Sequence, residues 1–220
     1  MTGFGVLPLL LGWGTLVGLD LVSFPQGLFS RPIVVASVTG LLLGDLESGL
    51  RVGLVLELFA LDVLPIGASR YPDFGPATVA ATALAAGRPW AEGLGPAVVL
   101  GLVMATIGGH SMGLVRRING RAVRKAEASL AAGDSATVSR LQWLGLTADA
   151  LRGLALTIAG LLLVIGYRMI PAPVGLARTI GLVVVGGGVV AGLHGVSRRS
   201  AGWRWITLGL GLGAGAAWLR

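Results

Sequence analysis

The sequence predicts an all-α, polytopic integral membrane protein with about six to eight membrane segments. Of its 220 residues, 54% are hydrophobic and only 12% are charged, and the mean hydropathy is +0.84. A soluble domain has about a quarter of its residues charged, so ten carboxylates and seventeen basic groups cannot cover a water-facing surface of this size. The apolar content excludes a disordered chain, and the lack of cysteine excludes a disulfide scaffold. The 37 glycines indicate closely packed helices.

Long uncharged runs locate the simple membrane-spanning helices. Residues 1–19, 93–115 and 179–197 are long enough to cross a bilayer, for which about 20 apolar residues are needed. The runs 153–167 and 205–219 are shorter, and we expect their flanking arginines to reach the headgroups. The first run follows no basic stretch and precedes no small-residue cleavage site, so we expect a membrane helix and not a cleaved signal peptide.

The segment from residue 20 to residue 92 differs from these simple spans, because charged residues and prolines interrupt its apolar runs. Six of the ten carboxylates and five of the ten prolines lie between residues 20 and 76. Lipid tolerates charged groups and non-helical backbone only where they are buried in protein or line a cavity. Short segments interrupted by Gly and Pro are typical of re-entrant or broken helices around a transport site. We therefore expect residues 1–115 to form a membrane region that holds the substrate site.

A basic segment, residues 116–146, separates this region from C-terminal transmembrane helices over residues 147–220. It holds six of the seventeen basic residues, which places it in the cytoplasm under the positive-inside rule. Residues 121–132 are rich in helix formers and stop at Gly133-Asp134, so we expect an amphipathic arm on anionic headgroups or against a partner. No aromatic residues interleave with the basic cluster, so nucleic acid is not an expected partner.

Asp20, Gln26 and the Arg31-Pro32 pair form the first group of polar residues in an apolar context. A carboxylate and an amide can accept and donate the hydrogen bonds that hold a sugar in a fixed orientation. The alternative is an interfacial loop, in which Asp20 ends the first helix and Arg31 pairs with it. The residues alone leave both interpretations open.

Glycines and two carboxylates form the second group. Gly40 and Gly44 are four residues apart, Asp45 follows, and Gly49, Gly53 and Glu57 again recur every four residues. Small residues at this spacing share one helix face and predict close helix packing. Glu57 lies on the same face among leucines, where a carboxylate is costly without a partner or a ligand.

The third group is residues 65–73, which contain two prolines, one glycine and Asp73. This composition forbids a continuous helix, so backbone amides and carbonyls become available to a ligand. An ordinary exposed turn is the alternative.

Together the three groups resemble the membrane subunit IIC of the mannose/fructose/sorbose family of the sugar phosphotransferase system (PTS). The spacing matches without interruption for more than fifty residues, and similar residues continue more weakly at Ala126, Gly133-Asp134 and Arg152. The strongest matches are Asp20, Gln26, Arg31-Pro32, Gly44-Asp45, Gly49, Gly53, Glu57-Leu58, Leu61, Ile66-Gly67 and Pro72-Asp73.

This resemblance implies a permease subunit that pairs with a homologous membrane subunit, IID, and carries a hexose or related sugar across the bacterial inner membrane. Cytoplasmic IIA and IIB subunits would phosphorylate the sugar, so the chain itself would hold no catalytic residue, metal or cofactor. IIC–IID pairs would assemble further into a homo-oligomer. The implied sugar contacts are Asp20, Gln26, Glu57 and Asp73. The implied supporting residues are Arg31, Pro32, Asp45, Gly67, Ser69 and Pro72.

Three positions depart from the family pattern and keep other functions open. Asp62 and Arg70 replace small residues and could pair with each other, and Gln142 lies where the family often has histidine. One alternative is a sensor or scaffold that keeps the fold but is silent in transport. Another is a carrier coupled to ions or protons through Glu57 and Asp62. The two histidines, His110 and His194, lack acidic or histidine neighbours, so we expect them to be structural.

Overall fold

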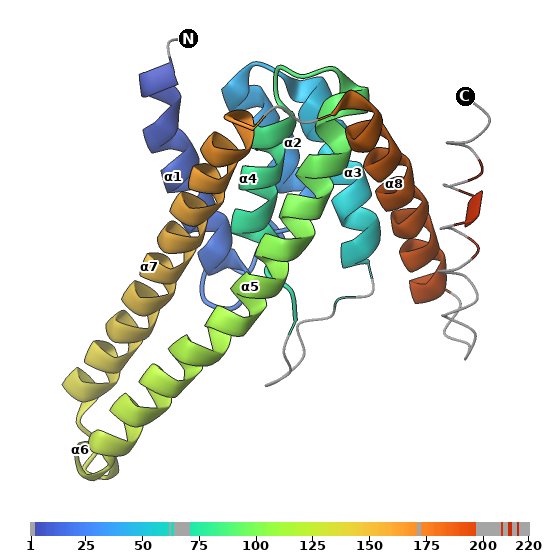
Figure 1. Cartoon of the computed structure of the whole chain (residues 1–220). Helices are drawn as coiled ribbons and strands as arrows, with labels where there is room; N and C mark the ends of the chain where they lie inside the picture. The colour runs from blue at the N-terminus through green and yellow to red at the C-terminus, as the bar shows by residue number, and fades with distance from the viewer. Residues whose placement is uncertain are drawn as a thin grey trace.

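The computed structural model describes residues 3–61, 63, 71–170 and 173–196, together with Leu208, Gly211, Leu212 and Gly215. These residues form helices and no strand, which confirms the all-α, polytopic membrane fold (Figure 1). Asp62, Gly67, Ser69 and Arg70 lie outside the described residues, as does almost all of the expected span 205–219. The helices are α1 (Gly3–Asp20), α2 (Pro32–Leu43), α3 (Leu46–Ala60), α4 (Phe74–Ala85), α5 (Trp90–Lys125), α6 (Glu127–Ala131), α7 (Ser135–Arg168) and α8 (Val174–Val196).

Two helix lengths dominate the architecture. The 36 residues of α5 and the 34 of α7 correspond to about 54 and 51 Å, well beyond the roughly 30 Å of a bilayer core. Within the described residues, α5, α7 and the first 19 residues of α8 are long and apolar enough to cross a membrane. The helices α2, α3 and α4 have only 12, 15 and 12 residues, which agrees with the expectation of short, broken segments in the N-terminal third.

The basic segment is not a separate loop, because α5 and α7 run through it. The expected boundaries after residues 115 and 146 fall inside these two helices, which converge at α6 away from the short helices (Figure 1). We call residues 116–146 the arm. The arm turns where the sequence predicted a stop: Gly133 has a φ of 77°, and the Asp134 side chain accepts a hydrogen bond from Ala136 N to begin α7.

The second group of residues forms a tight helical hairpin. Pro32 begins α2, and Gly44, with a φ of 74°, ends it and donates its amide to the carbonyls of Gly40 and Leu41. A Cβ on Gly53 would lie 2.8 Å from the Ala36 Cβ, so these glycines let α3 lie directly on α2. The prediction of close helix packing is confirmed.

The core surrounds α4, whose twelve residues are all buried. Leu84 of α4 is buried together with Leu56 of α3 and Val98 of α5, in the region where these three helices are in contact. On the other side, α1 crosses α7 at Gly18, where an added Cβ would come within 3.0 Å of the Gly153 Cα. The helices α1 to α4 thereby pack beside the N-terminal half of α5 and the C-terminal half of α7, away from α6 (Figure 1).

Candidate functional site

Four helix ends meet around a cavity of about 250 Å³. Asp20 ends α1 and Ala60 ends α3, while Pro32 begins α2 and Phe74 begins α4, and all four line the cavity. The volume lies below the roughly 300–1,000 Å³ typical of sites for drug-sized ligands, so it suits a small molecule. The other lining residues are Leu21, Gln26, Leu28, Ser30, Arg31, Val63 and Pro72.

Asp20 organises the loop between α1 and α2. It is only 2% exposed, and its two carboxylate oxygens accept hydrogen bonds from the amides of Gly27, over 2.6 Å, and Ser30, over 2.8 Å. Between these anchors, Gln26 and Leu28 have positive φ values of 57° and 64°, a conformation that non-glycine residues rarely adopt. The alternative in which Arg31 pairs with Asp20 is wrong, because backbone amides occupy both oxygens and Arg31 has another partner.

That partner is Glu57. The guanidinium Nε of Arg31 donates to Glu57 Oε1 over 2.7 Å, and its Nη2 contacts the same oxygen. The second oxygen, Oε2, accepts from the amide of Ile33 over 3.1 Å and so caps the start of α2. Arg31 thus connects the loop to the last turn of α3. It also supplies the partner that the Glu57 carboxylate requires among its leucine neighbours.

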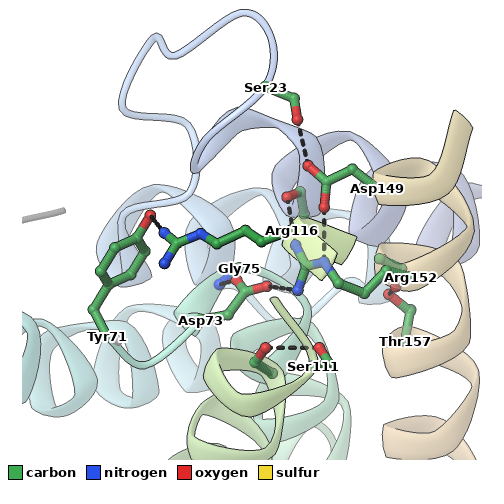
Figure 2. A network of polar contacts seen from close by, with 12 residues as sticks. Ser23, Tyr71, Asp73, Gly75, Ser111, Arg116, Asp149, Arg152 and Thr157 are labelled. Carbon is green, nitrogen blue, oxygen red and sulfur yellow. Dashed lines mark hydrogen bonds and ion pairs between the residues drawn. The ribbon is translucent and has the colours of Figure 1, made fainter. Parts of the chain in front are cut away.

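Asp73 belongs to a second, more deeply buried group. Its carboxylate caps α4 by accepting from Gly75 N, and it accepts from Arg152 Nη1 over 2.6 Å. Arg152 also donates from Nε to Asp149 over 2.7 Å and from Nη2 to the Gly18 carbonyl over 3.1 Å. Figure 2 shows Arg152 between the two carboxylates, with the Ser23 hydroxyl donating to the far oxygen of Asp149.

The sequence interpretation missed the contribution of α7 to this group. Arg152 was noted only as a weak family match, and Asp149 was not singled out. A usable signal is present: Asp149 and Arg152 are opposite charges three residues apart, and they are the only charged residues between positions 141 and 167.

The structure brings together five of the predicted site residues on the cavity wall: Asp20, Gln26, Arg31, Pro32 and Pro72. Neither Glu57 nor Asp73 lines the cavity, since each accepts hydrogen bonds from an arginine beside it. A direct sugar contact from either one stays a prediction.

Asp45 lies away from the cavity, at the opposite end of α3 from Glu57. The separation of twelve residues along the chain corresponds to about 18 Å of helix. There Asp45 caps α3 and accepts from the amide of Gly87 over 2.9 Å, which holds the pKa of its carboxyl below its usual range. Asp45 therefore fixes the turn between α2 and α3 and does not support the cavity wall.

The cavity combines apolar faces with a few fixed polar groups. The Gln26 amide and the Arg31 guanidinium are planar groups that can hydrogen-bond to hydroxyls, beside the apolar side chains of Leu21, Leu28 and Phe74. Among the described residues, no group of three or more His, Cys, Asp or Glu side chains is placed to hold a metal ion. His110 is exposed on α5. Among the described residues, its side chain has one hydrogen bond, to the Thr106 carbonyl of the same helix.

Comparison with known proteins extends the resemblance over most of the chain. Residues 7–193 match the family described as the PTS system sorbose-specific IIC component. The mannose-specific EIIC component of Escherichia coli K12 is 28% identical over 131 residues, which are 59% of this chain and 47% of that protein. The fructose permease IIC component of Bacillus subtilis is 29% identical over 58% of this chain and 46% of its own length.

The chain spans about half the length of these curated relatives. The sorbose-specific EIIC component of Lacticaseibacillus casei is 38% identical over 72 residues, 33% of this chain and 26% of that protein. A solved structure titled "Structure of membrane protein" has the same fold, with a TM-score of 0.73, 24% identity and coverage of 98% of this chain and 87% of its own. The chain is an integral membrane protein of bacterial type, and it belongs to the sorbose-specific IIC family of the sugar phosphotransferase system.

Proposed function

We propose that this chain binds a hexose or related sugar in the cavity between the four helix ends and carries it across the inner membrane. The observation that carries this proposal is the meeting of four helix ends around one small cavity. Discontinuous helices whose ends face a common space are the usual construction of transporter sites.

The cavity chemistry supports a neutral sugar. A sugar presents hydroxyls around its edge and C–H groups on its faces, and the cavity offers both planar polar groups and apolar side chains. The guanidinium of Arg31 is balanced by Glu57, so the wall offers no uncompensated positive charge to attract an anion. The names of the relatives, for mannose, fructose and sorbose, agree with a ligand of this size.

We further propose that the sugar contacts are Asp20 and Gln26, joined by Glu57 and Asp73 if the arginines release them, with Gly67 and Ser69 as supports. The partners would be a IID membrane subunit, in a homo-oligomer of IIC–IID pairs, and cytoplasmic IIA and IIB subunits that phosphorylate the sugar. The arm, with six basic and two acidic side chains, would face the cytoplasm.

Ligand-dependent stabilisation tests the proposal. The full chain, co-purified with a IID subunit in lipid nanodiscs, is heated with and without D-mannose, D-fructose or L-sorbose. We expect at least one sugar to raise the Tm, because a ligand that binds only the folded state stabilises it. We expect Gln26→Ala to weaken the binding about tenfold, which corresponds to roughly 1.4 kcal/mol.

Gln142→Ala is the matched control, since Gln142 is an exposed glutamine on the arm and should leave binding unchanged. No Tm shift with any of the three sugars, or equal loss in both variants, would contradict the proposal. Sugar binding without uptake in reconstituted vesicles would favour the transport-silent sensor or scaffold instead.

A further inference from the structure

Two walls of the cavity are hydrogen-bonded to a single helix, on the side that faces away from the cavity. One wall is the loop between α1 and α2, and the other is the segment 71–74 that leads into α4. Asp149 on α7 accepts from Ser23 in the first wall, while Arg152 on α7 donates to Asp73 in the second (Figure 2). The two α7 residues are themselves joined between Arg152 Nε and Asp149 Oδ1.

None of these tying groups faces the cavity. The side chain of Arg152 is 5% exposed, that of Asp73 is 0% and that of Asp149 is 1%. Ser23 is not among the lining residues either. Any effect of Ser23, Asp149 or Arg152 on a bound sugar must therefore act through the position of the walls.

We propose that Asp149 and Arg152 are positioning residues of the sugar site, which fix the spacing between the two cavity walls. This inference rests on the proposed sugar binding. Asp149 acts on the first wall through the Ser23 hydroxyl, and Arg152 acts on the second wall through the α4 cap. Because both lie within one turn of one rigid helix, the spacing of the walls is set by α7.

The guanidinium of Arg152 suits this task because it reaches three segments at once. Its three nitrogens donate to Asp149, to Asp73 and to the carbonyl of Gly18 at the end of α1. A lysine ammonium is a single point charge and cannot span these three acceptors in the same fixed geometry. A second cation, Arg116 on α5, donates to the Tyr71 hydroxyl over 3.3 Å at the start of the second wall.

The sharpest test changes one hydroxyl. Ser23→Ala removes the bond from the first wall to Asp149, and Ser23→Thr keeps it. Thr157→Val is a matched control, because Thr157 is a fully buried hydroxyl on the same helix that bonds only within it, to Gly153, in the hydrogen bonds of the described residues. Each variant of the full chain is purified with IID in nanodiscs, and its Kd for D-mannose, D-fructose and L-sorbose is measured beside its Tm.

We expect Ser23→Ala to raise the Kd roughly tenfold with a small change in Tm, because a misplacement of the order of 1 Å is costly in a preorganised site. Ser23→Thr should restore the affinity. Thr157→Val should lower the Tm without changing the Kd. Arg152→Lys should weaken binding more than Ser23→Ala, since it loosens both walls.

Hydrogen exchange supplies a readout that does not depend on the ligand. In Ser23→Ala we expect faster exchange at the amides of Gly27 and Ser30, the two that Asp20 holds, and unchanged exchange in α4. If the wild type binds a sugar and Ser23→Ala binds it equally well, the positioning role is overturned while the proposed function stands. If the wild type binds none of the three sugars, the proposed function fails, and unchanged exchange in Ser23→Ala overturns the positioning role as well.

Discussion

Individual arginines and carboxylates hold this membrane site together in two different ways. Arg31 and Glu57 lie near the cavity, with side chains 30% and 17% exposed, whereas Arg152 and Asp73 are almost completely buried. Removing one member of a buried pair leaves an uncompensated charge, and that penalty falls as exposure to solvent grows. We therefore expect the two pairs to differ in their tolerance of substitution.

The Arg31–Glu57 pair should show energetic coupling in a double-mutant cycle. We expect Glu57→Gln and Arg31→Gln each to lower the free energy of unfolding, and the double variant to lose less than their sum, with a coupling of about 0.5–3 kcal/mol. Thermal unfolding in detergent measures it. The control is Glu47→Gln on the same helix: Glu47 is 74% exposed and pairs with Arg51, so the change should be below about 1 kcal/mol. Simple additivity of the Arg31 and Glu57 effects would contradict the observed pairing.

Leu28 offers a second test at the residue scale, because its backbone is left-handed with a φ of 64°. Its side chain is 71% exposed, so truncation should cost little packing. We expect Leu28→Gly to be more stable than Leu28→Ala by about 1 kcal/mol, since only glycine adopts this conformation without a Cβ penalty. Chemical unfolding of the two variants makes the comparison, and an alanine variant as stable as the glycine variant would argue against this loop conformation.

At the scale of the helices, single residues determine where several of them begin and end. Pro32, Gly44-Asp45 and Gly133-Asp134 are local signals, and the helices begin or end at each of them. Those boundaries could be predicted because a proline, a left-handed glycine or a capping aspartate acts on its own few neighbours. Helix was expected over residues 121–132 because of their helix formers, but the continuation of the membrane spans α5 and α7 into the basic segment was not predicted, because positive charge indicated a boundary there.

Two helical glycines, one at the contact between α2 and α3 and one outside it, should respond in opposite ways to substitution by alanine. A Cβ on Gly49 would collide with the carbonyl oxygen of Ala36, whereas a Cβ on Gly12 of α1 meets nothing within 4 Å among the described residues. We expect Gly49→Ala to lower stability by more than about 1 kcal/mol, because backbone cannot move aside. Gly12→Ala should be neutral or stabilising, since alanine has the higher helix propensity. The Tm of each variant tests this prediction, and equal Tm values for Gly49→Ala and Gly12→Ala would contradict the close contact between α2 and α3.

Asp134 at the start of α7 predicts a pH-dependent helix end. The Thr137 hydroxyl and the Ala136 amide donate to its carboxylate and hold its pKa below its usual range. A lowered pKa means that the cap is fully formed above the ordinary aspartate pKa of about 3.9 and is lost as the pH falls through the lower, folded-state pKa. We expect Asp134→Ala to speed amide exchange over residues 135–138 at neutral pH, whereas Asp134→Asn should retain most of the protection. Exchange in Asp134→Ala that equals the exchange of the wild type would show that the cap has no effect.

At the scale of the whole molecule, orientation in the membrane can be tested cleanly because the chain has no cysteine. Ser129 lies at the tip of the arm, and Glu47 lies at the opposite end, in the first turn of α3. We expect a membrane-impermeant maleimide to label Glu47→Cys in spheroplasts and Ser129→Cys only in inverted membrane vesicles. The reverse pattern would contradict a cytoplasmic arm.

The whole site depended on long-range partners that a single sequence does not reveal. Asp20, Gln26 and Arg31 could be predicted, since polar residues in an apolar context stand out. Their partners could not: Glu57 is 26 residues from Arg31, and Arg152 is 79 residues from Asp73. Three-dimensional packing also decided that Asp20 would hold backbone amides and that Asp45 would lie at the far end of α3.

The crossing of α1 and α7 has a mechanical consequence for the arm. At Gly18 and Gly153 the two backbones touch without side chains between them, so this point can serve as a fulcrum for α7. The first residue of α7, Ser135, lies eighteen residues or about 27 Å away, and a tilt of 5° about the fulcrum would shift it by roughly 2 Å. Arg152 is adjacent to the fulcrum and would move by only about a tenth of an ångström. Asp149, four residues from the fulcrum, would move by about 0.5 Å, so a tilt of this kind displaces the arm several times more than the groups that tie the cavity walls.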